Sequence, residues 1–166
     1  MRPAYLTAAA SFFLSATAFG LMWMVGPAGA EPFEDNPDAV ARDPDYAAGK
    51  LAMDQSDWAK ASERFQRAAL RDPDNPDLQN YLGYAHRKLG KLDLAFKHYG
   101  RAIELSPQHR GAHEYIGEAY LLVGDLANAE KHLAALRDIC LRPCEELGDL
   151  QKAVAEFRTQ KGMQSH

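Results

Sequence analysis

Two cysteines carry the most clearly defined chemistry in the sequence. Cys140 and Cys144 are separated by Leu141-Arg142-Pro143. Four residues apart they lie within bridging range, and Pro143 disfavours a helix running through the pair. In an exported protein this spacing predicts a structural disulfide, with two free thiols as the alternative. A redox-active dithiol or half of a metal site is a third interpretation, which lacks the C-x-x-C spacing and further ligands nearby.

Histidine is the other residue type that suggests a metal. Among the six histidines, His109 and His113 are the only pair at the spacing of one helical turn, and Pro107 just before them places a turn there. Two ligands do not complete a zinc site, so we expect surface histidines and no metal. The others have no ligand-like spacing: His86, His98, His132 and His166. Nucleophile-elbow, phosphate-loop and metalloprotease patterns are absent, so we predict no cofactor and no enzymatic activity.

A period of 34 residues organises the central part of the chain. Small residues, large apolar or aromatic residues and a closing proline recur at fixed positions: Ala61, Ala95 and Ala129; Phe65, Tyr99 and Leu133; Pro73 and Pro107. Such a period is typical of a stacked array of helix-turn-helix units. The apolar fraction of 46% and the charged fraction of 25% fit one small globular domain with tails.

With these positions in register, the chain resembles the tetratricopeptide repeat family. The middle unit carries the resemblance, at Leu82-Gly83, Ala95, Tyr99, Ala102 and Pro107. It covers roughly residues 42–144 and departs from the pattern at His86, at Ala48 and Ala52, and at Leu141, where a proline is expected. The resemblance implies an all-α fold, a right-handed α-solenoid. We assign the three repeats to residues 44–139. The repeating 34-residue units have approximate bounds of 42–75, 76–109 and 110–143.

Glycine also recurs with this period, at Gly49, Gly83 and Gly117. Glycine within a helix costs about 1 kcal/mol relative to alanine. Its recurrence at one position therefore predicts that two backbones approach too closely there for a side chain.

In the family, the first helix of each repeat lines a concave groove, so the resemblance implies that a protein or peptide binds there. The matching positions hold Tyr46, Lys50, Asn80, Tyr84, Arg87, Lys88, Glu114 and Glu118. Tyrosines offer stacking surface, Asn80 can hydrogen-bond a peptide backbone, and Arg87 with Lys88 could hold a carboxylate. A solvated polar face is the alternative for each residue. Tyrosines at 46, 81 and 115 occupy positions where the chaperone-tail clamp of the family needs polar or cationic groups, so we do not predict that activity.

A further amphipathic segment follows the third repeat. Its apolar residues, spaced by three, four and three, are Leu147, Leu150, Val154 and Phe157. This pattern predicts a capping helix over 145–160 that covers the apolar end of the array. We assign 140–161 to the cysteine-linked turn and this helix, and 162–166 to a tail.

The first thirty residues predict a secretory signal peptide. Met1-Arg2 is basic, residues 4–25 contain no charged residue, and cleavage is expected after Ala30. The alternative is an uncleaved membrane anchor formed by residues 4–25. Residues 31–43 form an acidic leader, which we expect to be mobile. Without residues 1–30 the chain has 18 basic and 23 acidic residues, a net charge of 18 − 23 = −5, which gives nucleic-acid binding little electrostatic support.

Together these features predict a non-enzymatic, periplasmic or secreted scaffold that binds a protein or peptide segment in its groove, free of the membrane after cleavage. The alternative is a structural or oligomerisation module of an envelope assembly. A redox or metal role for the cysteines is the third hypothesis. The sequence does not determine the oligomeric state.

Overall fold

The computed structural model describes residues 43–164, which form seven helices and no strand. The helices are α2 (Pro44–Asp54), α3 (Trp58–Arg71), α4 (Pro76–Lys88), α5 (Leu92–Leu105), α6 (Arg110–Leu122), α7 (Leu126–Ile139) and α8 (Glu145–Gln164). The all-α fold predicted from the 34-residue period is confirmed. The predicted signal peptide or anchor and nearly all of the leader lie outside the described residues.

Within each repeat, the turn between the two helices is built in the same way. Ser56, Gly90 and Gly124 stand 34 residues apart and adopt left-handed backbone conformations, with φ of 55°, 73° and 80°. Glycine adopts this conformation without steric cost, which explains its presence at two of the three turns. The next residue is the N-cap of the second helix, and the side chains of Asp57 and Asp125 accept backbone N–H bonds there.

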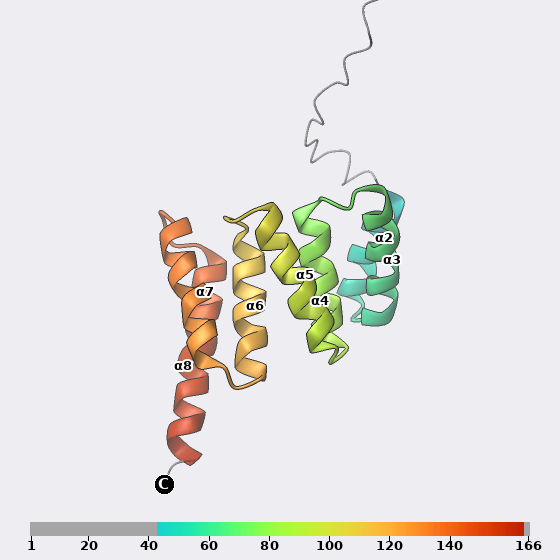
Figure 1. The fold of residues 1–166 in the computed structure, drawn as a ribbon. Coiled ribbons are helices and arrows are strands. Elements are labelled where there is room, and N and C mark those ends of the chain that lie inside the picture. Colours follow the sequence, from blue (N-terminus) through green and yellow to red (C-terminus); the bar gives the residue numbers. More distant parts are fainter. Residues whose placement is uncertain (1–42, 165–166) are drawn as a thin grey trace, which may run out of the picture. The chain divides into compact units, whose positions relative to one another are not determined.

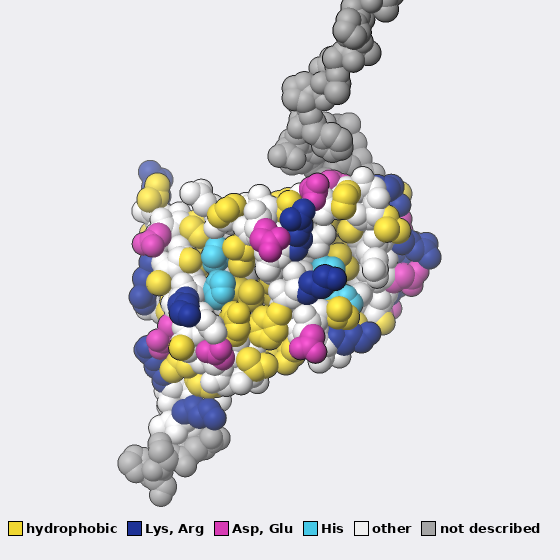
Figure 2. All heavy atoms as spheres, in the orientation of Figure 1, with side chains coloured by type: hydrophobic (Ala, Val, Ile, Leu, Met, Phe, Trp, Pro, Cys, Tyr) yellow, Lys and Arg dark blue, Asp and Glu magenta, His cyan; other side chains and the backbone are white. Residues whose placement is uncertain are grey.

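The helices form antiparallel pairs that stand side by side (Figure 1). Within the repeats, the packed pairs are α2 with α3, α4 with α5, and α6 with α7. Between successive repeats, α3 packs against α4, and α5 packs against α6. Helix α8 packs against α6 and α7, where the first helix of a further repeat would lie. On the face seen in Figure 2, Lys and Arg side chains are interspersed with acidic ones over the array. The first helices α2, α4 and α6, together with α8, are called the inner row below.

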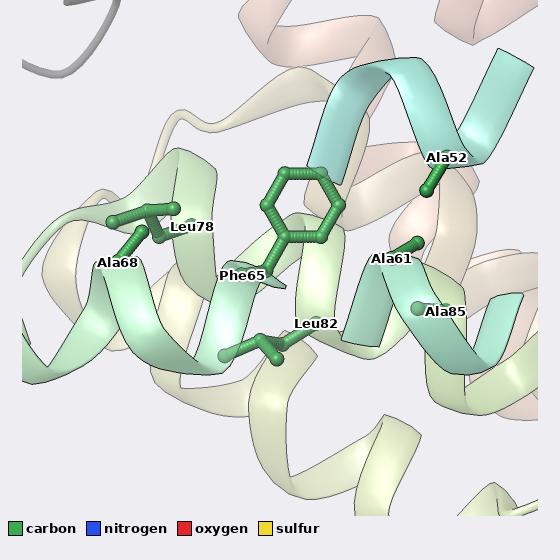
Figure 3. Packing of buried hydrophobic residues seen from close by; sticks show 7 residues of the cluster. All are labelled: Ala52, Ala61, Phe65, Ala68, Leu78, Leu82 and Ala85. Carbon is green, nitrogen blue, oxygen red and sulfur yellow. The ribbon is translucent and has the colours of Figure 1, made fainter. Parts of the chain in front are cut away.

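Small and aromatic side chains alternate in the core. Figure 3 shows one buried cluster, in which the Phe65 ring of α3 lies among alanines and leucines from α2, α3 and α4. Ala61, Ala95 and Ala129 are completely buried, as are Phe65 and Tyr99. Alanine at these crossings allows the helices to approach, and the larger side chains fill the space beside them.

The recurrent glycines have a different cause from the one predicted. A Cβ atom on Gly49 would lie 2.6 Å from the Phe65 ring, and one on Gly83 would lie 2.5 Å from the Tyr99 ring. The prediction of two close backbones is therefore wrong, because an aromatic side chain of the same repeat occupies the space. At Gly117 the side chain is Leu150 of α8, 2.6 Å from the hypothetical Cβ.

This contact with Gly117 shows how α8 closes the array. Leu150 and Val154 are buried against the third repeat, which confirms the predicted capping helix. Leu133 stands where the first two repeats have Phe65 and Tyr99, and Leu150 reaches Gly117 instead. The helix continues to Gln164, beyond the predicted end at 160 and into the predicted tail.

At the other end, α2 begins at Pro44, where the repeats were predicted to start, and its N-cap is the residue before. Asp43, which we assigned to the leader, caps α2 by accepting N–H bonds from Asp45 and Tyr46. Its carboxylate also forms an ion pair with Arg71 at 2.7 Å. These bonds hold the pKa of Asp43 below its usual range, the Arg71 bond contributing most. Asp43 is therefore part of the first repeat.

Candidate functional site

The first predicted groove residues lie at the α2 end of the inner row. Tyr46 packs edge-on against Phe65 and Tyr81, with ring centroids 6.1 and 5.9 Å away. Lys50 lies over the Tyr81 ring, and its ammonium donates a hydrogen bond to the Tyr81 hydroxyl at 3.3 Å. Burial raises the pKa of Tyr46 to about 12, so its hydroxyl stays neutral. Both predicted residues therefore contact α4 through Tyr81.

Next along the row, Arg87 holds together the middle of the inner face. Its guanidinium lies 5.1 Å from the Tyr84 centroid and 5.4 Å from the Tyr115 centroid, and it donates a hydrogen bond to the Glu118 carboxylate. The Arg87 side chain is only 10% exposed. We expected Arg87 to bind a carboxylate of a partner. Its guanidinium is instead already paired with the Glu118 carboxylate of the same chain.

Lys88 behaves differently from its neighbour. It is exposed, its ammonium lies 5.2 Å from the Tyr84 centroid and 5.7 Å from that of Trp58, and it forms no ion pair with the described residues. Because cation–π contact at an exposed site contributes only about 0.5–1 kcal/mol, Lys88 remains available to a bound anion.

Glu114 lies in a pocket between α4, α6 and α8 that we call the acidic pocket. Its volume is about 310 Å³, and it is lined by Asp77, Asn80, Tyr81, His109, Gly111, Glu114, Tyr115, Glu145, Glu146 and Asp149. Glu114 is only 8% exposed. Burial, then the nearby charges of Glu118, Asp149 and Glu146, raise the pKa of Glu114 to about 8. The predicted residues Asn80 and Glu114 therefore share one pocket with acids from α8.

A second hollow lies further along the same helices. It has a volume of about 450 Å³ and is lined by Arg87, Glu118, Leu121, Leu122, Ala153, Glu156, Phe157 and Gln160. We call it the apolar hollow. Leu122 is 64% exposed and contributes apolar surface to this hollow. Since Glu114 and Glu118 are one helical turn apart on α6, the two hollows follow each other along the inner row.

The described histidines form internal contacts, and the surface position predicted for His113 is wrong, because His113 is buried, as is His86. Figure 2 shows histidine side chains among hydrophobic ones. His113 Nε2 donates to the Pro107 carbonyl at 3.0 Å, since a carbonyl can only accept. Its Nδ1 shares one hydrogen bond with Nδ1 of His132, also at 3.0 Å.

The preceding repeat contains the same network with glutamine in place of His113. Gln79 donates to the Pro73 carbonyl at 3.0 Å, and its oxygen accepts from Nδ1 of His98 at 2.9 Å. Burial lowers the pKa of His98 and of His132 to about 4. These histidines tie the two helices of a repeat to its incoming loop, which is a structural role.

Cys140 and Cys144 form a disulfide with an S–S length of 2.05 Å and a Cα–Cα distance of 6.0 Å. The bond spans the turn between α7 and α8. Among residues 43–164, no group of three or more His, Cys, Asp or Glu side chains is arranged to hold a metal ion. In that same part of the chain, no helix has the length and apolar character needed to cross a membrane.

Comparison with known proteins identifies the family of this chain. A family model described as a tetratricopeptide repeat matches residues 46–109 and 86–140. A relative in Arabidopsis thaliana, "TPR repeat-containing thioredoxin TTL4", is 28% identical over 105 residues, which are 63% of this chain and 15% of that protein. The chain thus spans about a sixth of the curated relatives that it matches.

Solved structures of the same fold include complexes with peptides. The TPR2B domain of yeast Sti1, in a complex named for pHsp70, has a TM-score of 0.65 and 21% identity, and the match covers 70% of this chain and 94% of that one. The Yersinia enterocolitica secretion chaperone SycD, with a peptide of the translocator YopD, has a TM-score of 0.62 and 19% identity, covering 80% and 99%. At these identities the likeness establishes the fold alone.

Sequence reasoning missed the contribution of α8 to the site. Glu145, Glu146 and Asp149 line the acidic pocket, although we predicted only a capping role for this helix. Their spacing places them within one turn at the start of α8. Once α8 is recognised as standing in for a first helix of a repeat, this acidic turn falls on the inner row. The position of α8, which replaces the first helix of a further repeat, is the signal that could have identified these three acidic residues.

Proposed function

Because the chain belongs to the tetratricopeptide repeat family, we propose that it is an exported, non-enzymatic scaffold that binds a protein or peptide segment along α4, α6 and α8. One observation carries this proposal: the acidic pocket and the apolar hollow follow each other on these three helices, beside the half-buried rings of Tyr84 and Tyr115. The peptides named in the related complexes support it. The signal-like residues 1–30 support export.

Rigid packing of the inner row favours such binding. Tyr84 contacts Tyr115 with ring centroids 4.8 Å apart, and Arg87 joins both rings to Glu118. A surface fixed by contacts within the chain loses little conformational entropy on binding. From Glu114 to Leu121, α6 rises about 10 Å, a length that about three extended residues span. A short segment is therefore enough to reach both hollows.

The test is capture of partners from envelope extracts by the full-length chain. The groove variant combines Tyr84→Ala with Lys88→Glu, because Lys88 is exposed whereas reversal at Arg87 would place two carboxylates together in a half-buried site. The control variant combines Leu94→Ala with Lys97→Glu on α5. It removes one exposed apolar side chain and reverses one exposed cation.

We expect a partner that the wild type and the α5 variant retain and the groove variant loses, identified by mass spectrometry. Cross-linking should join it to the inner row. Equal retention by all three proteins would refute groove binding and assign the contact to another surface. Loss from both variants would also count against the groove, since it would show a general response to charge reversal.

A further inference from the structure

The acidic pocket holds more negative charge than the chain itself neutralises. Two of its five carboxylates have partners: Asp77 accepts from His109 at 3.0 Å, and Glu146 lies 3.7 Å from Arg110. The other three, Glu114, Glu145 and Asp149, form no ion pair or side-chain hydrogen bond with residues 43–164. The pocket therefore presents three carboxyl groups that have no partner in the described part of the chain.

Glu114 indicates where a donor group of a ligand would bind in this cluster. Its side chain is more than nine-tenths buried, lines the pocket and has no hydrogen-bond partner in the described part of the chain. Its carboxyl oxygens are not among the fully buried atoms that lack a partner, so they are accessible from the pocket. A donor bound in the pocket would therefore hydrogen-bond this carboxyl group.

Asn80 provides a second, independent acceptor in the same pocket. The residue is 4% exposed, and its amide oxygen is buried without a hydrogen-bond partner among residues 43–164. It comes from α4, whereas Glu114 belongs to α6 and Asp149 to α8. Acceptors thus approach from three helices.

The charges around Glu114 favour a cationic ligand. Glu118 on α6 and Glu146 and Asp149 on α8 raise the negative potential at Glu114, and Arg87 on α4 is the cation that opposes them. An anion would be repelled, and the carboxylates are not arranged to hold a metal ion. A compact cation with several N–H donors fits acceptors on three sides better than the planar fork of a guanidinium does.

We propose that the acidic pocket binds the ammonium group of a lysine side chain, carried by the segment that lies along the inner row. The assignment rests on the proposed function for the source of the ammonium, but the pocket chemistry is testable alone. Binding displaces a proton from Glu114, because the ammonium pairs with its ionised form. The rings of Tyr81 and Tyr115 line the same pocket and can contact the aliphatic stem.

The first measurement titrates the full-length protein with n-butylammonium chloride at constant ionic strength, followed by NMR chemical shifts of the Asn80 side-chain amide. Neutral n-butanol and n-butylguanidinium are the comparison ligands. Glu114→Gln removes the carboxylate. Asp54→Asn, at the exposed end of α2, makes the same change from carboxyl to amide outside the pocket and serves as the matched control.

We expect saturable binding of n-butylammonium that Glu114→Gln weakens by about tenfold or more and Asp54→Asn leaves unchanged. If only ionised Glu114 binds, its pKa of about 8 makes binding about 50-fold tighter at pH 8 than at pH 6. Equal affinity in the Glu114→Gln variant, equal shifts with n-butanol, or tighter binding of n-butylguanidinium would overturn the assignment.

A second arm separates a lysine side chain from a free amine. A capped peptide of five alanines with a central lysine is compared with the same peptide carrying norleucine. Tighter binding of the lysine peptide than of n-butylammonium supports a polypeptide source. Weaker binding would overturn that source and leave a site for small amines. Failure of partner capture with intact ammonium binding refutes only the proposed function.

Discussion

Replacement of Gly83 by alanine tests how the repeats pack. A Cβ atom at this position would lie 2.5 Å from two atoms of the Tyr99 ring, and Tyr99 is completely buried. A rigid, enclosed ring cannot move aside cheaply, so overpacking should cost about 3 kcal/mol, the upper part of the usual range. The better helix propensity of alanine returns about 1 kcal/mol. We therefore expect a net loss of about 2 kcal/mol in unfolding free energy.

Gly100 supplies the matched control. It lies within α5, and a Cβ atom there would meet nothing within 4 Å. Gly100→Ala should therefore gain up to about 1 kcal/mol from helix propensity alone. Urea unfolding followed by circular dichroism at 222 nm measures both variants. The structure predicts a difference of about 3 kcal/mol between the same substitution at two helical glycines.

A double variant identifies the clash itself. Leu133 occupies in the third repeat the position of Tyr99 in the second, so Tyr99→Leu is a substitution that this fold already contains. Gly83→Ala should be much less harmful beside Tyr99→Leu, with a coupling of about 1 kcal/mol or more. Equal stability of Gly83→Ala and Gly100→Ala, or strictly additive effects in the double variant, would refute the packing explanation.

Three further predictions use the same unfolding assay. His113→Gln should change stability by less than about 0.5 kcal/mol, because the preceding repeat uses glutamine in this network, whereas His113→Leu should cost about 1–3 kcal/mol by leaving buried polar groups unpaired. Glu114 has a folded pKa of about 8, above the unfolded value of 4.5, so wild-type stability should fall as pH rises between these values. The total is at most about 5 kcal/mol, since a pKa difference of one corresponds to about 1.4 kcal/mol, and Glu114→Gln should flatten this slope. Ala95→Leu should cost about 1–3 kcal/mol, while Ala134→Leu, at an exposed position, should be nearly neutral.

The fold could be predicted because its determinants repeat within short stretches of sequence. Ala95 and Tyr99 lie one turn apart on one helix, and both are buried as their spacing requires. The cap was predictable for the same reason, since Leu150 and Val154 mark one face of α8. What each glycine faces was not predictable. That depends on which side chain crosses the helix, and the same position meets a ring in one repeat and a capping leucine in another.

The site was predicted only in part, because its chemistry depends on contacts between distant residues. Family positions identified Arg87 and Glu118 as groove residues, but their ion pair joins helices of successive repeats, 31 residues apart. Periodicity cannot show that one side chain satisfies another across that distance. Similarly, the hydrogen bond between His113 and His132 depends on the register of α6 against α7, which the spacing of the histidines does not reveal.

Helix α8 connects the stability of the array with its candidate site. Leu150 packs against Gly117 and holds the helix on the third repeat, and the adjacent residue Asp149 lines the acidic pocket. The docking that covers the apolar end of the array therefore also places a carboxylate beside Glu114 and contributes to its raised pKa. The disulfide at the start of α8 restrains the same turn. Any change that loosens this helix should consequently alter stability and cation binding together.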